Sequence, residues 1–219
     1  MLTKKIAVIG CGGQGGYILE YLVRLGVKSI IYWDGDRYDV SNLNRQIGCT
    51  EKTLGIKKVD ALTARLQEVN STIELFPRDW FFGDKSTDLE ELLETDFVFM
   101  AADCYYNIVV FRPLIRKAII SGIPVVDCPI IGKGGYVRIE TNNDLSHYDI
   151  ISERLQWQAA SPEEIAVSQT AYKCALLAAE AVNQMVLYFS RIRSACVDTR
   201  LDIDLYHHKY TLSDRFGIL

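Results

Sequence analysis

The sequence predicts one α/β domain with a Rossmann-like, mainly parallel sheet, helices on both faces and a C-terminal antiparallel hairpin. A short β-branched run, Lys5–Ile9, leads into the glycine cluster Gly10–Gly16, and a helical pattern follows. Further short apolar runs alternate with helical patterns, which is typical of parallel sheets covered by helices on both faces. Near the end, Thr199–Ser213 alternates apolar and polar residues around His207-His208, which indicates the hairpin.

The individual elements follow from periodicity and from glycine or proline punctuation. The first helix is expected to end at Gly26, because glycine favours the left-handed conformation that closes helices. The helix predicted at Ile108–Ser121 is expected to end before Gly122 for the same reason. Strands are expected at Lys5–Ile9, Lys28–Trp33, Glu74–Pro77, Asp96–Ala102, Pro124–Asp127 and Gly134–Glu140, and helices at Tyr17–Leu25, Lys57–Val69, Asp88–Glu94, Ile108–Ser121 and Ser161–Phe189.

A chain of 219 residues suits a single domain, 1–219. We expect a nucleotide-binding core at 1–140, a crossover loop at 141–165, where the chain becomes polar, and a C-terminal helix and hairpin at 166–219. The pattern Ser161-Pro162-Glu163-Glu164 resembles a capping box with proline at the first helical position, so the long helix is expected to start there.

Composition excludes several classes of protein. A net charge of −4 does not favour nucleic-acid binding. The longest apolar stretch, Ala175–Phe189, is interrupted by Glu180, Asn183 and Gln184, which favours a buried helix over a membrane span. The six cysteines are widely scattered without a C-x-x-C pair, so the sequence predicts no zinc site and fits a reducing cytoplasm.

The glycine cluster fits the pattern G-x-G-x-x-G between a strand and a helix. Small residues let the backbone approach phosphate or ribose closely, and the following helix presents free N–H groups. Asp34 ends the second strand, where a carboxylate can accept a hydrogen bond from a ribose hydroxyl. These features predict a nucleotide site and leave NAD and ATP equally open. The glycines assigned to this site are Gly10, Gly12, Gly13 and Gly15.

The segment Asp34–Gln46 and the lysine that follows it favour ATP. The segment combines three acids, three amides and two arginines, one of which is Arg45, and Lys58 lies at the start of the next predicted helix. A triphosphate needs several donors and cations, whereas a dehydrogenase has little use for this pair. The candidate nucleotide-binding residues here are Asp34, Asp36, Ser41, Asn42, Arg45, Gln46 and Lys58.

Asp103 directly follows the strand predicted at Asp96–Ala102. It is therefore expected at the carboxyl edge of the sheet, near the same crevice. A carboxylate facing a triphosphate is repulsive unless Mg²⁺ lies between them, so Asp103 is the candidate magnesium ligand.

Together these motifs resemble the ThiF/MoeB/HesA family, which also supplies the adenylation domains of ubiquitin-activating enzymes. The resemblance covers Gly10–Gly15, Asp34–Gln46, Gly55–Lys58 and Ala102-Asp103, and it spans roughly the first 140 residues. It implies that ATP adenylates a substrate carboxylate and that pyrophosphate is released. The resemblance implies that Asp34 holds the ribose and that Asp103 holds the Mg²⁺. It implies that the phosphates are held by Ser41, Asn42, Arg45 and Lys58. The catalytic residues that it implies are Arg45, Lys58 and Asp103.

Three departures from the family pattern concern the substrate. The two C-x-x-C pairs that bind zinc in sulfur-carrier activating members are missing. Only Met1–Lys4 precede the first strand, so the arginine that many members extend into the partner subunit's site is not expected. Thr141–Pro162 contains no cysteine for a thioester. We expect Cys128 and Cys174 to be core residues, whereas Cys104, beside Asp103, is the cysteine least readily explained by packing.

These departures favour a small-molecule acid of cofactor biosynthesis over the C-terminal glycine of a ubiquitin-like carrier protein. The tyrosines Tyr105, Tyr106 and Tyr136 are candidates for lining the acid's cleft. A family member that resembles this short, zinc-free form serves the maturation of the iron–guanylylpyridinol cofactor, whose pyridinol carboxylate is one such acid. A non-catalytic nucleotide-binding module and an NAD-dependent dehydrogenase are the remaining alternatives. The resemblance further implies a homodimer.

Overall fold

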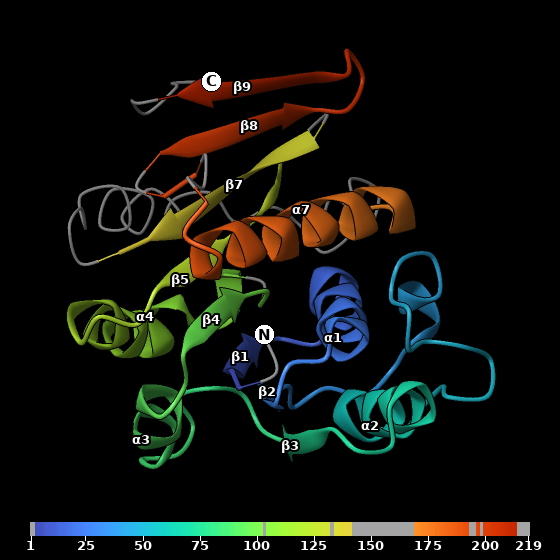
Figure 1. Ribbon diagram of the computed structural model, residues 1–219. Coiled ribbons are helices and arrows are strands. Elements are labelled where there is room, and N and C mark those ends of the chain that lie inside the picture. Colours follow the sequence, from blue (N-terminus) through green and yellow to red (C-terminus); the bar gives the residue numbers. More distant parts are fainter. Residues whose placement is uncertain are drawn as a thin grey trace.

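The computed structural model describes residues 3–102, 104–131, 134–141, 169–192, 196, 197 and 199–213, without the side chains of 104–111. The predicted crossover loop, the capping box at Ser161 and Asp103 lie outside these residues. The described part forms one sheet with helices on both faces (Figure 1). The predicted fold class is therefore confirmed.

The N-terminal half is a parallel sheet built by βαβ units. Its strands are β1 (Lys5–Ile9), β2 (Ser29–Trp33), β3 (Glu74–Arg78), β4 (Phe97–Met100) and β5 (Val125–Asp127), which pair in the order β3-β2-β1-β4-β5. The chain moves outward from β1 to β2 and returns to its other side with β4. The carboxyl ends of β1 and β4 therefore form a topological switch point, where such sheets place ligand crevices.

The second half continues the sheet with antiparallel strands. β7 (Gly134–Glu140) pairs with β5 and β8 (Arg200–Asp204), and β8 pairs with β9 (Lys209–Ser213). The predicted terminal hairpin is thus confirmed, and His208 at its turn has a φ of 51°. The short strand β6 (Ile130–Ile131), which pairs with β7, was not predicted from the sequence.

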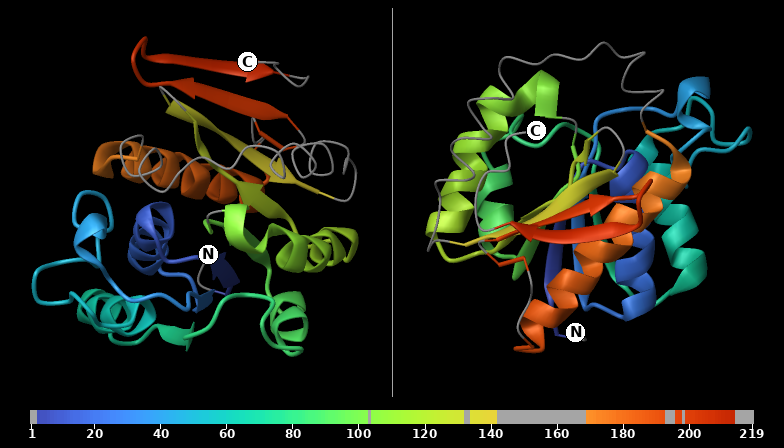
Figure 2. Two further views of the ribbon diagram at one scale, coloured as in Figure 1. Left: turned by 180° about the vertical axis from the view of Figure 1, so that it is seen from behind. Right: turned by 90° about the horizontal axis from the view of Figure 1, so that it is seen from above.

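Two helical layers enclose the sheet, as the two views of Figure 2 show. One face is covered by α1 (Gly13–Leu25), α2 (Lys58–Val69) and α7 (Ala171–Phe189), and the other by α3 (Asp88–Leu93) and α4 (Cys104–Ile120). Each layer has its own apolar core. None of the helices described is long and apolar enough to cross a membrane.

Three helix starts differ from the sequence prediction by four residues or more, and one of them is α4, which starts at Cys104 and not at the predicted Ile108. The first helix starts at Gly13, four residues before the predicted Tyr17, because the last glycines of the cluster take helical conformation. The last helix was predicted to run from Ser161, but α7 starts at Ala171 because Thr170 before it is extended, with φ −119° and ψ 156°.

Candidate nucleotide site

The glycine turn brings the end of β1 against the end of β4. Gly10 has a φ of +92°, and a Cβ built on it would lie 2.6 Å from the Cα of Ala102. Gly10 therefore permits both the left-handed backbone and the close approach of the two strands. α1 then begins with Gly12 as its N-cap, and no side chain caps its first turn. Its first N–H groups are directed at the switch point.

Gly15 and Gly16 provide a matched test of this turn. A Cβ at Gly15 would overlap the carbonyl oxygen of Gly10, whereas one at Gly16 would meet only a side-chain atom, the Cγ2 methyl group of the half-buried Ile47, at 3.0 Å. Both substitutions by alanine gain helix propensity. We expect Gly15→Ala to lower the free energy of unfolding by about 2 kcal/mol or more, and Gly16→Ala to change it by less than about 1 kcal/mol. Urea denaturation of both variants measures this, and equal effects would contradict the proposed steric role of Gly15.

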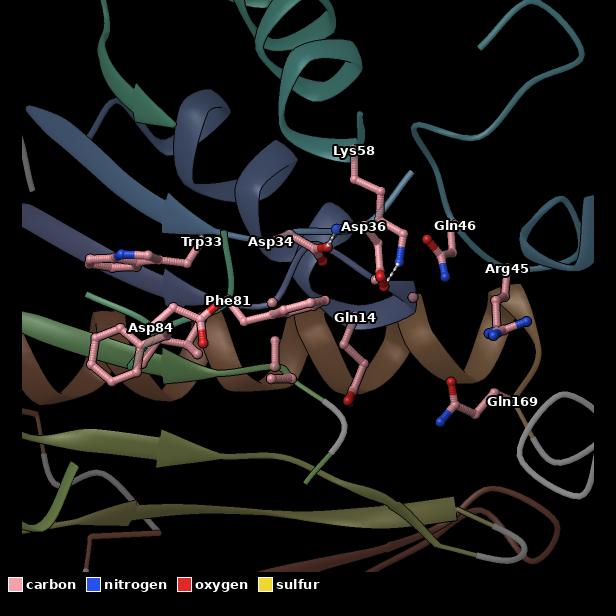
Figure 3. Close-up of a pocket in the computed structure, with 17 residues that line it drawn as sticks. Gln14, Trp33, Asp34, Asp36, Arg45, Gln46, Lys58, Phe81, Asp84 and Gln169 are labelled. Carbon is pink, nitrogen blue, oxygen red and sulfur yellow. Dashed lines mark hydrogen bonds and ion pairs between the residues drawn. The ribbon is translucent and has the colours of Figure 1, made fainter. Parts of the chain in front are cut away.

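A cavity of about 600 Å³ opens at this point of the sheet (Figure 3). It has an aromatic end at Trp33 and Phe81, a central group of carboxylates at Asp34 and Asp36, and an opposite end with Arg45 and the amides Gln46 and Gln169. Several predicted site residues line it together: Gly10, Gly12, Gly13, Asp34, Asp36, Arg45, Gln46 and Lys58.

Asp34 links the end of β2 to the glycine turn. Its side chain is buried, and its two oxygens accept hydrogen bonds from the backbone N–H groups of Cys11 at 2.7 Å and Asp36 at 2.9 Å. Burial raises the pKa of Asp34, while the positive charge of Lys58 and both hydrogen bonds oppose the rise. The carboxylate is therefore held in one orientation at the cavity wall.

Lys58 is a buried cation that lies beside the central carboxylates Asp34 and Asp36. Its Nζ donates to the Oδ2 atom of Asp36 at 2.8 Å. Burial alone would lower the pKa of Lys58, but Asp34 and Asp36 outweigh it and raise this pKa above its ordinary value. The ammonium group therefore stays charged and is aimed into the cavity from the start of α2.

Arg45 and Gln46 carry polar atoms that lack protein partners. Arg45 donates from one terminal nitrogen to the carbonyl of Ser41 at 2.8 Å and to the side-chain oxygen of Asn44 at 2.9 Å. Among the residues that the structure describes, its Nε and the Oε1 of Gln46 have no hydrogen-bond partner although both atoms are buried. Buried polar atoms are normally paired, so these two mark a place where a polar ligand fits.

Ser41 and Asn42 shape the turn that carries Arg45 and do not line the cavity. The Asp39 carboxylate accepts from the Ser41 N–H at 2.9 Å, and the Asn42 side chain accepts from the Asp39 N–H at 3.1 Å, which forms a capping box around a short 3-10 helix, Val40–Asn42. Their predicted direct contact with phosphate stays untested. In the structure they orient the backbone carbonyl that holds Arg45.

The aromatic end is formed by β2 and by the loop that follows β3. Trp33 is the last residue of β2, and its ring contacts Phe82 edge to face, with 5.1 Å between centroids. Phe81 covers Gly35, where a Cβ would lie 3.0 Å from its ring. Phe81, which is 41% exposed, presents a flat apolar ring at this end, next to the buried Trp33, and such a surface suits a planar heterocycle.

Several functional assignments lie outside the cavity or the described residues. Tyr136 is buried, and its hydroxyl donates to Asp127 at 2.9 Å, so it does not line the cavity. Cys128 and Cys174 are fully buried, as predicted. The side chains of Cys104, Tyr105 and Tyr106 are not among those described. In the described part of the chain, no group of three or more potential metal ligands is present.

Other residues that line the cavity were not predicted from the sequence. Gln14 occupies a variable position of the glycine motif and donates to the carbonyl of Cys128. Trp33 could have been recognised because it directly precedes Asp34 at the end of a strand. Phe81, Phe82, Asp84 and Gln169 carried no sequence signal, since they lie in irregular segments that only the tertiary fold brings to the cavity.

The strand order and the cavity at the switch point define a Rossmann-like α/β protein. The profile of the ThiF family matches residues 1–214, and the chain belongs to this family.

Individual relatives agree with this membership. The chain is 34% identical over 105 residues to the tRNA threonylcarbamoyladenosine dehydratase of Bacillus subtilis. The aligned region covers 47% of this chain and 41% of that protein. It is 28% identical over 142 residues to the molybdopterin-synthase adenylyltransferase of Escherichia coli. This aligned region covers 64% of this chain and 55% of that protein. The crystal structure of E. coli MccB with ATP matches in fold, with a TM-score of 0.75 at 17% identity over 97% of this chain and 64% of that one. The chain thus spans less than two thirds of the length of these proteins.

Proposed function

We propose that this protein binds ATP in the cavity and uses it to adenylate a carboxylate. One observation carries the proposal: along a single cavity, an aromatic end, a fixed carboxylate and a cationic end follow one another, and α1 begins beside them. This order matches base, ribose and phosphates of a nucleotide. Membership of the ThiF family and the likeness to the MccB structure with ATP support ATP as that nucleotide.

Each part of the nucleotide finds a chemically suitable partner. The base would lie against Trp33 and Phe81, and Asp34 would accept a hydrogen bond from the ribose. The open backbone of Gly12, where a Cβ would be 3.8 Å from its nearest neighbour, leaves room for phosphate. Arg45 and Lys58 would contact the phosphates, and the Arg45 Nε–H, a buried donor without a partner among the described residues, would gain an acceptor there.

The reaction is a displacement at the α-phosphorus of ATP. A carboxylate oxygen of the substrate forms a bond to this phosphorus, and the bond from the phosphorus to the bridging oxygen of the β-phosphate breaks. The products are an acyl-adenylate and pyrophosphate. Negative charge accumulates on the leaving pyrophosphate, where Arg45 and Lys58 stabilise it. One such preorganised contact contributes about 3 kcal/mol to lowering the barrier.

Mg²⁺ fits this scheme through Asp103. Among the described carboxylates that line the cavity, Asp34 is engaged by two N–H groups, Asp36 is engaged by Lys58, and Asp84 lies at the aromatic end (Figure 3), so none of them is a ready ligand beside the phosphates. Asp103 follows the close contact between Gly10 and Ala102 by one residue. We propose that it holds Mg²⁺, which would neutralise phosphate charge, and we expect Asp103→Ala to abolish activity.

For the substrate we infer a small-molecule carboxylic acid of cofactor biosynthesis, such as the pyridinol carboxylate of the iron–guanylylpyridinol cofactor. The absence of C-x-x-C pairs from this sequence supports it, since sulfur-carrier activating members carry them. The second candidate is the C-terminal glycine of a ubiquitin-like carrier. The similarity to the molybdopterin-synthase adenylyltransferase favours this alternative.

Exchange of labelled pyrophosphate into ATP tests the proposal. We expect exchange that depends on the carboxylate, because the exchange reverses adenylate formation. Exchange with a small acid supports the first substrate, exchange with a Gly-Gly-tailed protein supports the second, and an acid borne on RNA would point to a substrate like that of the B. subtilis relative. ATP binding without exchange for any acid would leave a non-catalytic module, and NAD binding in its place would contradict the proposal.

We further propose that the protein is a homodimer. Tyr172 and Leu176 of α7 expose 58% and 39% of their surface, although both are apolar side chains on one helix. Exposed apolar surface of this kind favours association. Light scattering of the purified protein measures the mass, and a monomer at micromolar concentration would contradict the expectation.

A further inference from the structure

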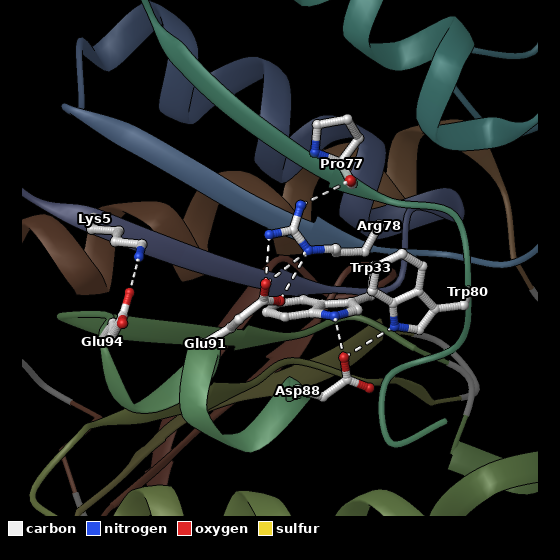
Figure 4. A network of polar contacts seen from close by, with 8 residues as sticks. All are labelled: Lys5, Trp33, Pro77, Arg78, Trp80, Asp88, Glu91 and Glu94. Atoms are coloured by element: carbon white, nitrogen blue, oxygen red, sulfur yellow. Dashed lines mark hydrogen bonds and ion pairs between the residues drawn. The ribbon is translucent and has the colours of Figure 1, made fainter. Parts of the chain in front are cut away.

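We propose that Asp88 is a positioning residue that holds both walls of the base-binding end of the cavity. The inference rests on the proposed nucleotide site and adds to it a buried side chain that touches no ligand. Asp88 is the first residue of α3, on the sheet face opposite α1, and it does not line the cavity. Figure 4 shows it beneath the two indole rings of Trp33 and Trp80.

Four N–H groups converge on this single carboxylate. Its Oδ1 accepts from the indole nitrogens of Trp33 at 3.1 Å and Trp80 at 3.0 Å. Its Oδ2 accepts from the backbone nitrogens of Gly83 at 2.7 Å and Lys85 at 3.2 Å. The side chain is fully buried, with 0% of its surface exposed. A carboxylate accepts at both oxygens and donates at neither, so it alone among side chains of this size satisfies all four donors.

The two indoles fix two different walls of the cavity. Trp33 lines the cavity itself and immediately precedes Asp34, the proposed ribose ligand. Trp80 begins the loop that carries Phe81 and Phe82, and the Lys85 ammonium lies 3.2 Å from the centroid of the Trp80 ring. Through Asp88, the end of β2 and this loop are therefore held in one arrangement.

The two backbone contacts fix the fold of the loop. Asp88 binds the N–H of Gly83, whose φ is +98°, and the Asp84 N–H donates to the carbonyl of Phe81 at 3.0 Å. This tight turn directs Phe81 over Gly35 and places Asp84 at the cavity. Without the carboxylate, the turn loses its two hydrogen bonds to the Asp88 side chain, and the aromatic wall loses its fixed position.

Among the described residues, no hydrogen bond or ion pair joins the cationic end of the cavity to this network. Arg45 is held by Ser41 and Asn44, and Lys58 is held by Asp36. A defect at Asp88 should therefore weaken recognition of the base and leave recognition of the phosphates unchanged. This separation distinguishes a positioning role from a general contribution to stability.

The test compares ATP with inorganic tripolyphosphate, which has the phosphates without the base. In Asp88→Asn, the amide nitrogen faces two of the four donors, so two buried N–H groups lose their acceptor. We expect calorimetric affinity for ATP to fall about tenfold, and affinity for tripolyphosphate to stay at the wild-type value. The matched control is Glu91→Gln on the same helix. Glu91 pairs with Arg78 at 2.6 Å and does not contact the loop's backbone, so this variant should bind both ligands normally.

Two outcomes overturn the proposal: unchanged ATP affinity in Asp88→Asn, or an equal loss for ATP and tripolyphosphate. If Asp88→Asn does not fold, Trp80→Phe decides, because it removes one donor and leaves the carboxylate in place. We expect about threefold weaker ATP binding in that variant, again without an effect on tripolyphosphate, and no selective loss would overturn the proposal. Failure of the wild-type protein to bind ATP would instead contradict the proposed function.

Discussion

Arg45→Ala should lower pyrophosphate exchange by about two powers of ten, while the protein stays folded. Arg45 is 9% exposed, and its guanidinium is oriented by the Ser41 carbonyl and the Asn44 side chain, so it reaches the cavity already fixed. Its Nε lacks a partner among the described residues, which leaves a donor for the phosphates. Because the contact strengthens as charge accumulates on pyrophosphate, the rate should fall more than the affinity for ATP.

Arg37→Ala is the matched control for this prediction. Arg37 lies in the same segment and also donates to a backbone carbonyl, that of Gly55 at 2.8 Å, but its side chain is exposed and does not line the cavity. Exchange should remain near the wild-type rate in this variant. Near-normal exchange in Arg45→Ala, with thermal unfolding as a check of the fold, would refute the assigned role.

Lys58→Met should also lower exchange by about two powers of ten, and it should change the pH dependence of ATP binding. Lys58 compensates Asp34 and Asp36 within the cavity. Burial raises the pKa of Asp34, and Lys58 opposes this rise. Without the lysine, the pKa of Asp34 rises further, so the carboxylate is protonated at a higher pH. The acid limb of the ATP-binding profile should therefore shift to higher pH.

The neighbouring lysine supplies the control. Lys57 pairs with Asp79 at a partly exposed site and does not line the cavity, so Lys57→Met should keep both exchange and the pH profile. Calorimetry across the acid range measures the profile. A profile that does not move in Lys58→Met, or that moves to lower pH, would contradict the electrostatic account of the site.

The regular part of the site was predictable from the sequence. Gly10 and Asp34 follow predicted strands, and parallel strands end at one edge of a sheet, so local patterns were enough to bring them together. Arg45 and Lys58 were recognised through their spacing from Asp34 and through the family resemblance. Both line the cavity with it.

The irregular part could not be predicted, because its positions depend on tertiary contacts. Phe81 lies at the cavity because Asp88 folds its loop, and no periodicity in the sequence reports such a contact. The start of the last helix was misplaced because Ser161 and Pro162 form a strong local start signal, whereas the helix described starts after the extended Thr170. Ser41 and Asn42 match the family motif, yet their side chains are used to build the turn beneath Arg45.

The most direct test of the central claim is a crystal structure of the protein with a non-hydrolysable ATP analogue and Mg²⁺. It requires no knowledge of the carboxylate substrate. We predict the base between Trp33 and Phe81, the ribose at Asp34, and the β- and γ-phosphates within hydrogen-bond distance of Arg45 and Lys58. A triphosphate at the aromatic end, or a nucleotide bound outside this cavity, would contradict the account.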